Sequence, residues 1–295
     1  MRRLLIAVLL AICTPDFALA WGELGHRTVA EVASRSLSEP AAGAIARLLG
    51  PERFVDVATW ADDYREINPE TDSWHVVNIP GWADVYLRAR DCAADQCVIE
   101  KIREFKATLA DTSALPATRM IALKFLIHLV GDIHTPFHAL DPFSRRGGVW
   151  ARVGDTVESL HLLWDNDFVD ALGSDEGALA DMLEIMFSAE RSEWAQGTPE
   201  DWANESFVIA RQFIRAHDVP AKMRANAATQ ERPIELGRAV IDDAKPIVAR
   251  RLYLAGLRLG RLLNEAFDRG RAATSLTRSR CTRSRCRRRP ATSPP

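Results

Sequence analysis

Residues 117–138 have the sequence ATRMIALKFLIHLVGDIHTPFH, and this stretch decides the fold. Apolar side chains occupy nearly all sides of a helix over residues 117–130, which is typical of a helix buried at the centre of a domain. His128 and Asp132 are spaced i, i+4 and therefore project from one face of that helix. A buried carboxylate is unfavourable unless a cation compensates it, and Lys124 is the only nearby Lys or Arg on that face. A bound metal ion would meet this need.

A second pair, His161 and Asp165, repeats the same spacing on another apolar helix. Pro136 ends the first helix, which allows His138 to turn towards the second pair. One such pair is more typical of a structural hydrogen bond, but two pairs on apolar helices favour metal binding. Imidazole and carboxylate ligands without thiolates suit Zn²⁺, and a site open to water suits catalysis. His26 and His75 are two further histidines whose role neither pair explains.

The rest of the chain shows helical periodicity almost throughout. One face of an opening helix is formed by Val29, Ala30, Ala33 and Leu37. A helix near the end, beyond a break predicted at Pro246, has a face formed by Val248, Leu252, Ala255, Leu259 and Leu262. Strand-like runs are limited to Val76–Val77 and residues 149–153, enough for a small hairpin at most. We therefore predict one all-α domain over residues 21–270.

The first twenty residues have the three parts of a secretory signal peptide: a basic start, a nine-residue apolar run, and a small-x-small site ending at Ala20. The apolar run is too short to span a bilayer as a helix. A lipoprotein anchor at Cys13 is disfavoured because Ile12, rather than a small residue, precedes it. We expect a secreted or periplasmic protein that begins at Trp21 after cleavage, is a monomer, and has no stable membrane association.

Charge is distributed unevenly along the chain. Residues 271–295 carry eight Arg and no acidic residue, whereas residues 21–270 carry 28 Lys or Arg and 39 Asp or Glu, a net charge of −11. The C-terminal segment has too few apolar residues to fold, so we predict a disordered basic tail that either tethers polyanions or has no specific role. The acidic body argues against a polyanionic substrate, but metal ions concentrated in one cleft remove that objection.

Export would place the cysteines in an oxidising compartment. Cys92 and Cys97 flank a short polar loop, which favours a local disulfide bond. A metal site at this pair is disfavoured because no further Cys or His lies close by.

Five motifs occur together in this chain and are specific in combination: WGxxGH at 21–26, ATWADxxR at 58–65, WHVVNIP at 74–80, FLIHLVGDIHxPxH at 125–138 and LHxxWD at 160–165. In these motifs and their order, the chain resembles the S1/P1 family of secreted zinc-dependent nucleases, and specifically its bacterial members. The resemblance covers roughly residues 21–268. It implies an all-α fold of the zinc-dependent phospholipase C and P1 nuclease type that holds three Zn²⁺ ions.

The resemblance also implies the metal ligands. They fall into three groups: Asp62, His75, His128 and the bridging Asp132; Trp21 (through its amino and carbonyl groups), His26 and Asp132; and His138, His161 and Asp165. His134 belongs to the motif but not to the ligand set, and it should point away from the metal ions because it lies two residues from Asp132.

For activity, the resemblance implies that a metal-activated hydroxide hydrolyses single-stranded DNA and RNA to 5′-phosphorylated products, with 3′-nucleotidase activity as a further expectation. Asp62 and Asp132 would act as catalytic carboxylates through the metal ions. Arg65 would offer a planar guanidinium to the charge that develops on phosphate. The alternative for Arg65 is an ordinary surface arginine on a helix.

Departures from the family pattern occur where the nucleobase should bind. Val76 replaces an aromatic residue, Asn78 replaces an Asp, and a loop that is usually Gly-Gly-Asn is Gly147-Gly148-Val149. Loss of the aromatic residue removes a stacking contribution of about 1–3 kcal/mol per base. We expect hydrolysis to survive these changes, while base preference and affinity for single strands change. Trp150 is a candidate replacement surface for stacking.

Two alternatives compete with the nuclease interpretation. A zinc-dependent phospholipase C-like phosphodiesterase would share the N-terminal Trp and the three-metal cluster, but that branch typically has a shorter gap between its last His ligands and ends in Glu. Here the gap from His138 to His161 is 23 residues and the group ends in Asp165. A non-catalytic periplasmic zinc-binding protein would be expected to contain His-rich or Cys-rich loops, which this sequence lacks.

Overall fold

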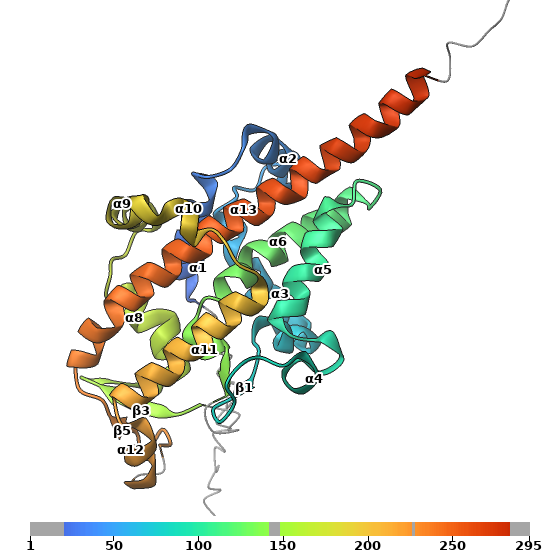
Figure 1. The fold of residues 1–295 in the computed structure, drawn as a ribbon. Coiled ribbons are helices and arrows are strands. Elements are labelled where there is room, and N and C mark those ends of the chain that lie inside the picture. Colours follow the sequence, from blue (N-terminus) through green and yellow to red (C-terminus); the bar gives the residue numbers. More distant parts are fainter. Residues whose placement is uncertain (1–20, 142–147, 226–227, 284–295) are drawn as a thin grey trace, which may run out of the picture.

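The computed structural model describes residues 21–141, 148–225 and 228–283, with side chains up to Asp268. Helices dominate it, as predicted (Figure 1). The α-helices are α1 (Glu23–Ser34), α2 (Glu39–Leu49), α3 (Trp60–Ile67), α4 (Arg88–Asp91), α5 (Val98–Ala110), α6 (Pro116–Asp132), α7 (Leu160–Leu162), α8 (Phe168–Asp170), α9 (Glu176–Phe187), α10 (Arg191–Trp194), α11 (Pro199–Ala216), α12 (Val219–Ala225) and α13 (Ala239–Arg283). Short 3₁₀ or π turns are η1 (Asp56–Thr59), η2 (Pro69–His75), η3 (Ala93–Asp95), η4 (Pro136–His138), η5 (Leu163–Asp167) and η6 (Ser188–Glu190).

Helix α6 is the buried helix that the sequence predicts. Every residue from Ala122 to Asp132 is buried. Helix α5 packs along one side of α6, and α1 packs along α13, which runs the length of the molecule (Figure 1). The predicted face of α1 is confirmed, since Val29, Ala30 and Ala33 are all buried. The ligand-bearing end of α6 therefore lies inside the fold rather than at its surface.

The predicted break at Pro246 is wrong. Helix α13 begins at Ala239 and continues through Pro246. A proline inside a helix costs about 3 kcal/mol, because it removes one backbone hydrogen bond and crowds the preceding turn. Ala244 and Val248 are both fully buried on either side of Pro246. Burial of this apolar face on both sides of the proline offsets the local cost.

The strands are few, as predicted, but their partners differ from the predicted hairpin. Val76–Val77 forms no strand; β1 (Ile79–Pro80) pairs in parallel with β2 (Leu140–Asp141). In a second sheet β3 (Trp150–Val153) pairs antiparallel with β4 (Thr156–Ser159) and in parallel with β5 (Ile234–Glu235). The β3–β4 pair is a local hairpin, whereas the β1–β2 and β3–β5 pairings join segments that are distant in sequence, which alternation within one segment cannot reveal.

The C-terminal boundary at residue 270 stays a prediction. Helix α13 continues to Arg283, past the start of the predicted tail, through a segment with helix-favouring Arg, Ala and Leu residues. Residues 284–295 and the predicted signal peptide, residues 1–20, lie outside the described residues. Within the described part of the chain, no helix combines the length and the apolar character needed to cross a membrane.

Candidate metal centre

Asp132, the last residue of α6, lies at the centre of a buried cluster. Its Oδ2 is 2.9 Å from His75 Nδ1 and 3.4 Å from His128 Nε2, and its Oδ1 is 3.4 Å from His26 Nε2. His26 comes from α1, His75 from η2 and His128 from α6, so three separate elements converge on one carboxylate. All of these side chains are at most 1% exposed. The fold thus brings together residues that the sequence places far apart.

Helix α3 adds Asp62 and Arg65 to this cluster. Asp62 Oδ1 lies 3.5 Å from His128 Nε2 and 3.1 Å from Arg65 Nη2. Arg65 is only 4% exposed, so the surface-arginine alternative is wrong. Among the side chains that the structure describes, Arg65 is the one Lys or Arg within 4.0 Å of the Asp62 carboxylate, and none forms such an ion pair with Asp132 or Asp165. Lys124 does not neutralise Asp132, because its Nζ pairs with Glu52 Oε1 at 2.7 Å.

A neighbouring cluster consists of His138, His161 and Asp165. Asp165 Oδ1 is 3.6 Å from His138 Nε2, and Asp165 Oδ2 is 3.3 Å from His161 Nε2. Asp165 lies in η5, a π-helical turn, and such turns are frequent at functional sites. The backbone N–H of Gly22 donates to the Asp165 carbonyl at 2.7 Å. This bond ties the segment that starts at Trp21 to the second cluster.

Backbone carbonyls fix two of the imidazole rings. His128 Nδ1 lies 2.8 Å from the Ala58 carbonyl, and His138 Nδ1 lies 2.9 Å from the His75 carbonyl. A carbonyl oxygen can only accept, so each Nδ1 must carry the proton and each Nε2 presents a lone pair to its cluster. Hydrogen bonds of this kind orient histidine ligands and raise their basicity. No pattern in the sequence points to these partners, because they are main-chain atoms.

Many buried polar atoms of the two clusters have no hydrogen-bond partner among the described residues. They are His26 Nδ1 and Nε2, Asp62 Oδ1, His75 Nε2, His128 Nε2, Asp132 Oδ1, His138 Nε2, His161 Nε2, and both carboxylate oxygens of Asp165. Buried polar groups without partners are costly, so their concentration here requires a ligand. Three sets of donor atoms lie within 4.8 Å of one another, with the compositions His26–Asp62–His128, His75–His128–Asp132 and His138–His161–Asp165. Imidazole nitrogens and carboxylate oxygens at this spacing fit Zn²⁺.

The pKa values of the buried groups in the two clusters also favour metal binding. Burial raises the pKa of Asp132 to about 7 and the pKa of Asp165 to about 8. Burial also lowers the pKa of His75 to about 3 and the pKa of His161 to about 4. His75 and His161 are therefore neutral and able to donate lone pairs near neutral pH. The carboxylates need a nearby cation before their charged form is favoured.

Glycines in the WGxxGH and VGD motifs allow close approach of the N-terminal segment. A Cβ atom at Gly25 would lie 2.8 Å from Trp21 Cβ, and one at Gly131 would lie 2.7 Å from His26 Nδ1. Both distances are shorter than side-chain atoms tolerate. Trp21 is fully buried. These glycines let Trp21 and His26 pack directly against α6, beside Asp132.

The predicted nucleobase-binding residues have different environments. Val76 is half-buried and Asn78 is exposed, both just after His75. Val149 is 1% exposed and belongs to the hydrophobic core. Gly147 lies outside the described residues, while Trp150 is half-buried in β3. The substrate roles of these positions stay predictions; among the described ones, Val76, Asn78 and Trp150 have side chains that are at least partly accessible, whereas Val149 does not.

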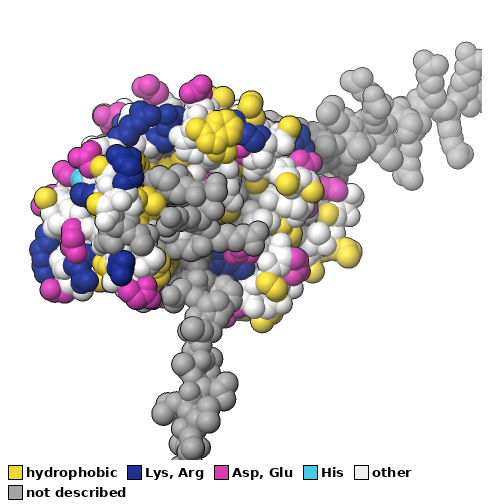
Figure 2. Space-filling model, turned by 90° about the horizontal axis from the view of Figure 1, so that it is seen from below, with side chains coloured by type: hydrophobic (Ala, Val, Ile, Leu, Met, Phe, Trp, Pro, Cys, Tyr) yellow, Lys and Arg dark blue, Asp and Glu magenta, His cyan; other side chains and the backbone are white. Residues whose placement is uncertain are grey.

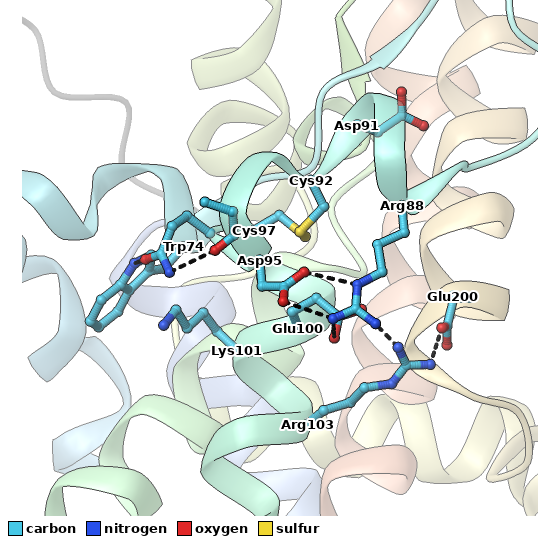
Figure 3. Close-up of a disulfide and its surroundings, with 12 residues drawn as sticks. Trp74, Arg88, Asp91, Cys92, Asp95, Cys97, Glu100, Lys101, Arg103 and Glu200 are labelled. Carbon is cyan, nitrogen blue, oxygen red and sulfur yellow. Dashed lines mark hydrogen bonds and ion pairs between the residues drawn. A yellow bond between two sulfur atoms is a disulfide. The ribbon is translucent and has the colours of Figure 1, made fainter.

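The disulfide bond between Cys92 and Cys97 is confirmed (Figure 3). The loop that it closes contacts the segment around His75. Trp74 Nε1 donates to Gln96 Oε1 at 2.7 Å, and Val98 N donates to the Val76 carbonyl at 3.1 Å. The disulfide therefore supports the outer side of the segment that carries one candidate ligand.

We expect the double substitution Cys92→Ser and Cys97→Ser to lower the free energy of unfolding by about 2 kcal/mol, because the short closed loop gains entropy in the unfolded chain. In a domain of this size, that loss corresponds to a fall of roughly 4–8 °C in melting temperature. Thermal unfolding of the zinc-loaded protein measures it. Zinc content should be unchanged, since no metal ligand is removed. An unchanged melting temperature would contradict this stabilising role.

Comparison with known proteins agrees with this geometry. A family model described as S1/P1 Nuclease matches residues 21–268. Endonuclease 3 of Arabidopsis thaliana is 26% identical over 297 residues, covering 91% of this chain and 96% of that relative. Nuclease S1 of Aspergillus oryzae is 28% identical over 176 residues (57% of this chain, 61% of the relative), and Nuclease P1 of Penicillium citrinum is 34% identical over 127 residues (40% and 47%). The chain belongs to the S1/P1 nuclease family.

Proposed function

We propose that this protein is a secreted or periplasmic, monomeric zinc-dependent endonuclease that hydrolyses single-stranded DNA and RNA to 5′-phosphorylated products and also has 3′-nucleotidase activity. The observation that carries the proposal is the buried set of imidazole and carboxylate atoms without partners, in a chain of the S1/P1 nuclease family. A metal-dependent hydrolase of phosphoric esters needs such a set to hold its metal ions.

We assign three Zn²⁺ ions to this set. The first would bind Asp62, His75, His128 and Asp132; the second would bind Asp132, His26 and the amino and carbonyl groups of Trp21; the third would bind His138, His161 and Asp165. Support comes from two groups of mutually close donor atoms, His75–His128–Asp132 and His138–His161–Asp165, which fall within the first and third sets, and from the central position of Asp132. The remaining close group, His26–Asp62–His128, joins residues of the first and second sets. The contact of Gly22 with Asp165 supports the placement of Trp21 beside both clusters.

When bound, zinc ions supply Lewis-acid stabilisation of phosphate charge and make water acidic enough to act as a nucleophile near neutral pH. The protein contributes fixed groups around that chemistry. Asp62 holds the Arg65 guanidinium through one nitrogen, while the Nε of Arg65 is buried without a partner. Arg65 is therefore oriented before substrate arrives and can donate to a phosphate oxygen without reorganisation.

Electrostatic attraction for a polyanionic substrate must come from groups at the site itself rather than from the protein surface as a whole. Figure 2 shows Lys and Arg side chains interspersed with Asp and Glu side chains over the described part of one face. Such a surface gives little net attraction for a phosphate backbone. We infer that the metal ions and Arg65 provide most of the affinity for phosphate, which favours substrates whose phosphates can enter the site one at a time.

The decisive experiment uses the mature protein purified with zinc. It is incubated with single-stranded DNA, RNA, 3′-nucleotides and phosphatidylcholine, with chelation and zinc re-addition as controls. We expect zinc-dependent nucleotide release with 5′-phosphate ends. Release of phosphocholine without nucleotide release would favour the phospholipase C-like alternative. Zinc binding without turnover on any substrate would favour the non-catalytic alternative.

Val76 provides a test of base recognition. Replacement by Phe should restore a stacking surface beside His75 and tighten binding of single-stranded DNA by about 1–3 kcal/mol, or roughly 5- to 150-fold in KM. The turnover number should change little, since Val76 has no role in holding metal. Val208→Phe, at a 44% exposed valine on α11, is the matched control and should leave KM unchanged. Equal KM values for all three proteins would show that bases do not contact position 76.

A further inference from the structure

The C-terminal end of α6 has an unusual connection to the rest of the fold. Asp132 is the last residue of α6, and His138 follows after a turn. Pro136 lacks the N–H that would otherwise bond to the Ile133 carbonyl in a tightened last turn. Side chains from two other helices bond to the carbonyls here instead: Ser206 Oγ donates to the Ile133 carbonyl at 2.6 Å, and Arg251 Nε donates to the His134 carbonyl at 3.0 Å.

Arg251 uses all three nitrogens of its guanidinium. Besides bonding the His134 carbonyl, Nη2 donates to Ser206 Oγ at 2.7 Å and Nη1 donates to Glu205 Oε2 at 2.7 Å. The side chain is 2% exposed. Arg251 thus orients the Ser206 hydroxyl and holds two consecutive peptide carbonyls of the turn. It bonds the His134 carbonyl directly and the Ile133 carbonyl through Ser206.

Arg258 lies two helical turns after Arg251 on the same face of α13, and it holds a side chain of the same turn, that of His134. Its Nη1 lies 2.9 Å from His134 Nε2, and its guanidinium bonds both oxygens of Glu205 at 2.6 and 2.8 Å. His134 Nδ1 donates to the Val130 carbonyl at 2.7 Å, so Nε2 accepts from Arg258 and the ring is neutral. His134 points into this network and away from the metal clusters, as predicted.

Stability alone does not explain this network. Arg251 and Arg258 are buried and carry a desolvation cost, while the side chain of Glu205, which pairs with both, is 38% exposed. Well-packed apolar residues of similar volume would often stabilise a fold as well as such buried charges, or better. What apolar side chains cannot do is fix the positions of two peptide carbonyls. The turn that they belong to joins Asp132 to His138, whose Nδ1 is 4.0 Å from Asp132 Oδ1.

We propose that Arg251 is a positioning residue that holds the 133–138 turn and thereby sets the placement of Asp132 relative to His138, the junction between the two candidate metal clusters. Ser206, held by Arg251, fixes the Ile133 carbonyl; Glu205 pairs with both arginines, and Arg258 fixes the His134 side chain. The proposal rests on zinc binding by these clusters, but not on nuclease activity.

The test compares Arg251→Met with Arg250→Met. Arg250 is the adjacent arginine of α13, exposed and placed 4.4 Å from the Trp194 ring, so it is the matched control. Zinc affinity is measured by competition with a chromophoric chelator, well below the melting temperature of each protein. Loss of a partner that orients a metal-binding segment typically weakens metal binding 10- to 100-fold. We expect a loss of that size for Arg251→Met, and less than a twofold change for Arg250→Met.

Two milder variants keep the test informative if Arg251→Met does not fold. Arg251→Lys keeps the charge but cannot reach all three acceptors, and Ser206→Ala removes only the hydroxyl. Both should weaken zinc binding by a smaller factor, and each should lower kcat more than it raises KM, because the substrate groups are untouched.

Unchanged zinc affinity in folded Arg251→Met or Arg251→Lys, together with a lower melting temperature of the metal-free protein, would overturn the proposal and leave Arg251 a purely stabilising role. If the wild-type protein binds zinc but cleaves no nucleic acid, the proposed function fails while the affinity comparison still decides the role of Arg251.

Discussion

Replacement of Asp132 by Asn is expected to abolish nuclease activity while making the metal-free protein more stable at alkaline pH. Asp132 contacts three histidines from three elements, and its carboxylate is assigned to two of the three zinc ions. An uncharged amide should leave both of those sites largely empty. Metal ions contribute several kcal/mol of transition-state stabilisation, so kcat/KM should fall at least about a thousandfold.

The stability effect follows from the pKa of Asp132. Burial raises that pKa to about 7 in the folded metal-free state, against about 4 in an unfolded chain. The folded state therefore binds the proton more tightly. The stability that comes from the protonated carboxyl is fully present below about pH 4 and is lost as the pH rises through about 7. Asn cannot ionise, so the variant escapes this loss, and its metal-free form should unfold at a higher temperature than wild type at pH 8.

Zinc content by elemental analysis and melting curves with and without chelator measure both effects. Asp63→Asn is the matched control, since Asp63 is exposed on the same helix as Asp62. The control should keep full zinc content and activity. If Asp132→Asn retained three zinc ions per chain, the bridging assignment would be wrong.

An extra residue before Trp21 is expected to have the second largest effect. Our assignment gives the Trp21 amino group to the second zinc ion, and an amino group that becomes part of a peptide bond cannot bind metal in the same way. Trp21 is fully buried beside Gly25, which leaves little room for an added residue. We expect the extended protein to bind one zinc ion fewer per chain and its kcat to fall about a hundredfold. Loss of one metal ion removes several kcal/mol of transition-state stabilisation, and the remaining metal ions offset only part of it.

The cleanest comparison uses one preparation. A protein with a cleavable leader is assayed before and after a protease leaves Trp21 as the first residue, and zinc content is measured at both stages. Activity should appear only after cleavage. Equal activity and equal zinc content before and after cleavage would remove Trp21 from the ligand set.

The sequence predicts two pairs of candidate ligands because their spacing is local. His128 with Asp132 and His161 with Asp165 lie one helical turn apart, and that geometry follows from the helix itself. The direction of His134 follows from the same rule. The sequence also predicts the Cys92–Cys97 disulfide, since a short polar loop leaves those two residues close together.

What the sequence does not reveal depends on contacts between distant elements. The environment of Arg65 could not be decided from its helix alone, because burial depends on what packs against α3. Arg251 lies 117 residues from the His134 carbonyl that it bonds, and no periodicity links the two. The interpretation of Pro246 was wrong for a related reason: local propensity predicts a break, while apolar burial on both sides of the proline maintains the helix.

The packing of α1 against α13 has a consequence for when the enzyme becomes active. Helix α1 carries His26 near the beginning of the chain, and α13 supplies Arg251 near its end. The centre can therefore be completed only after nearly the whole chain has been synthesised and its two ends have met, a long-range step that is slow compared with local helix formation. For a chain exported before it folds, that meeting takes place outside the cytoplasm.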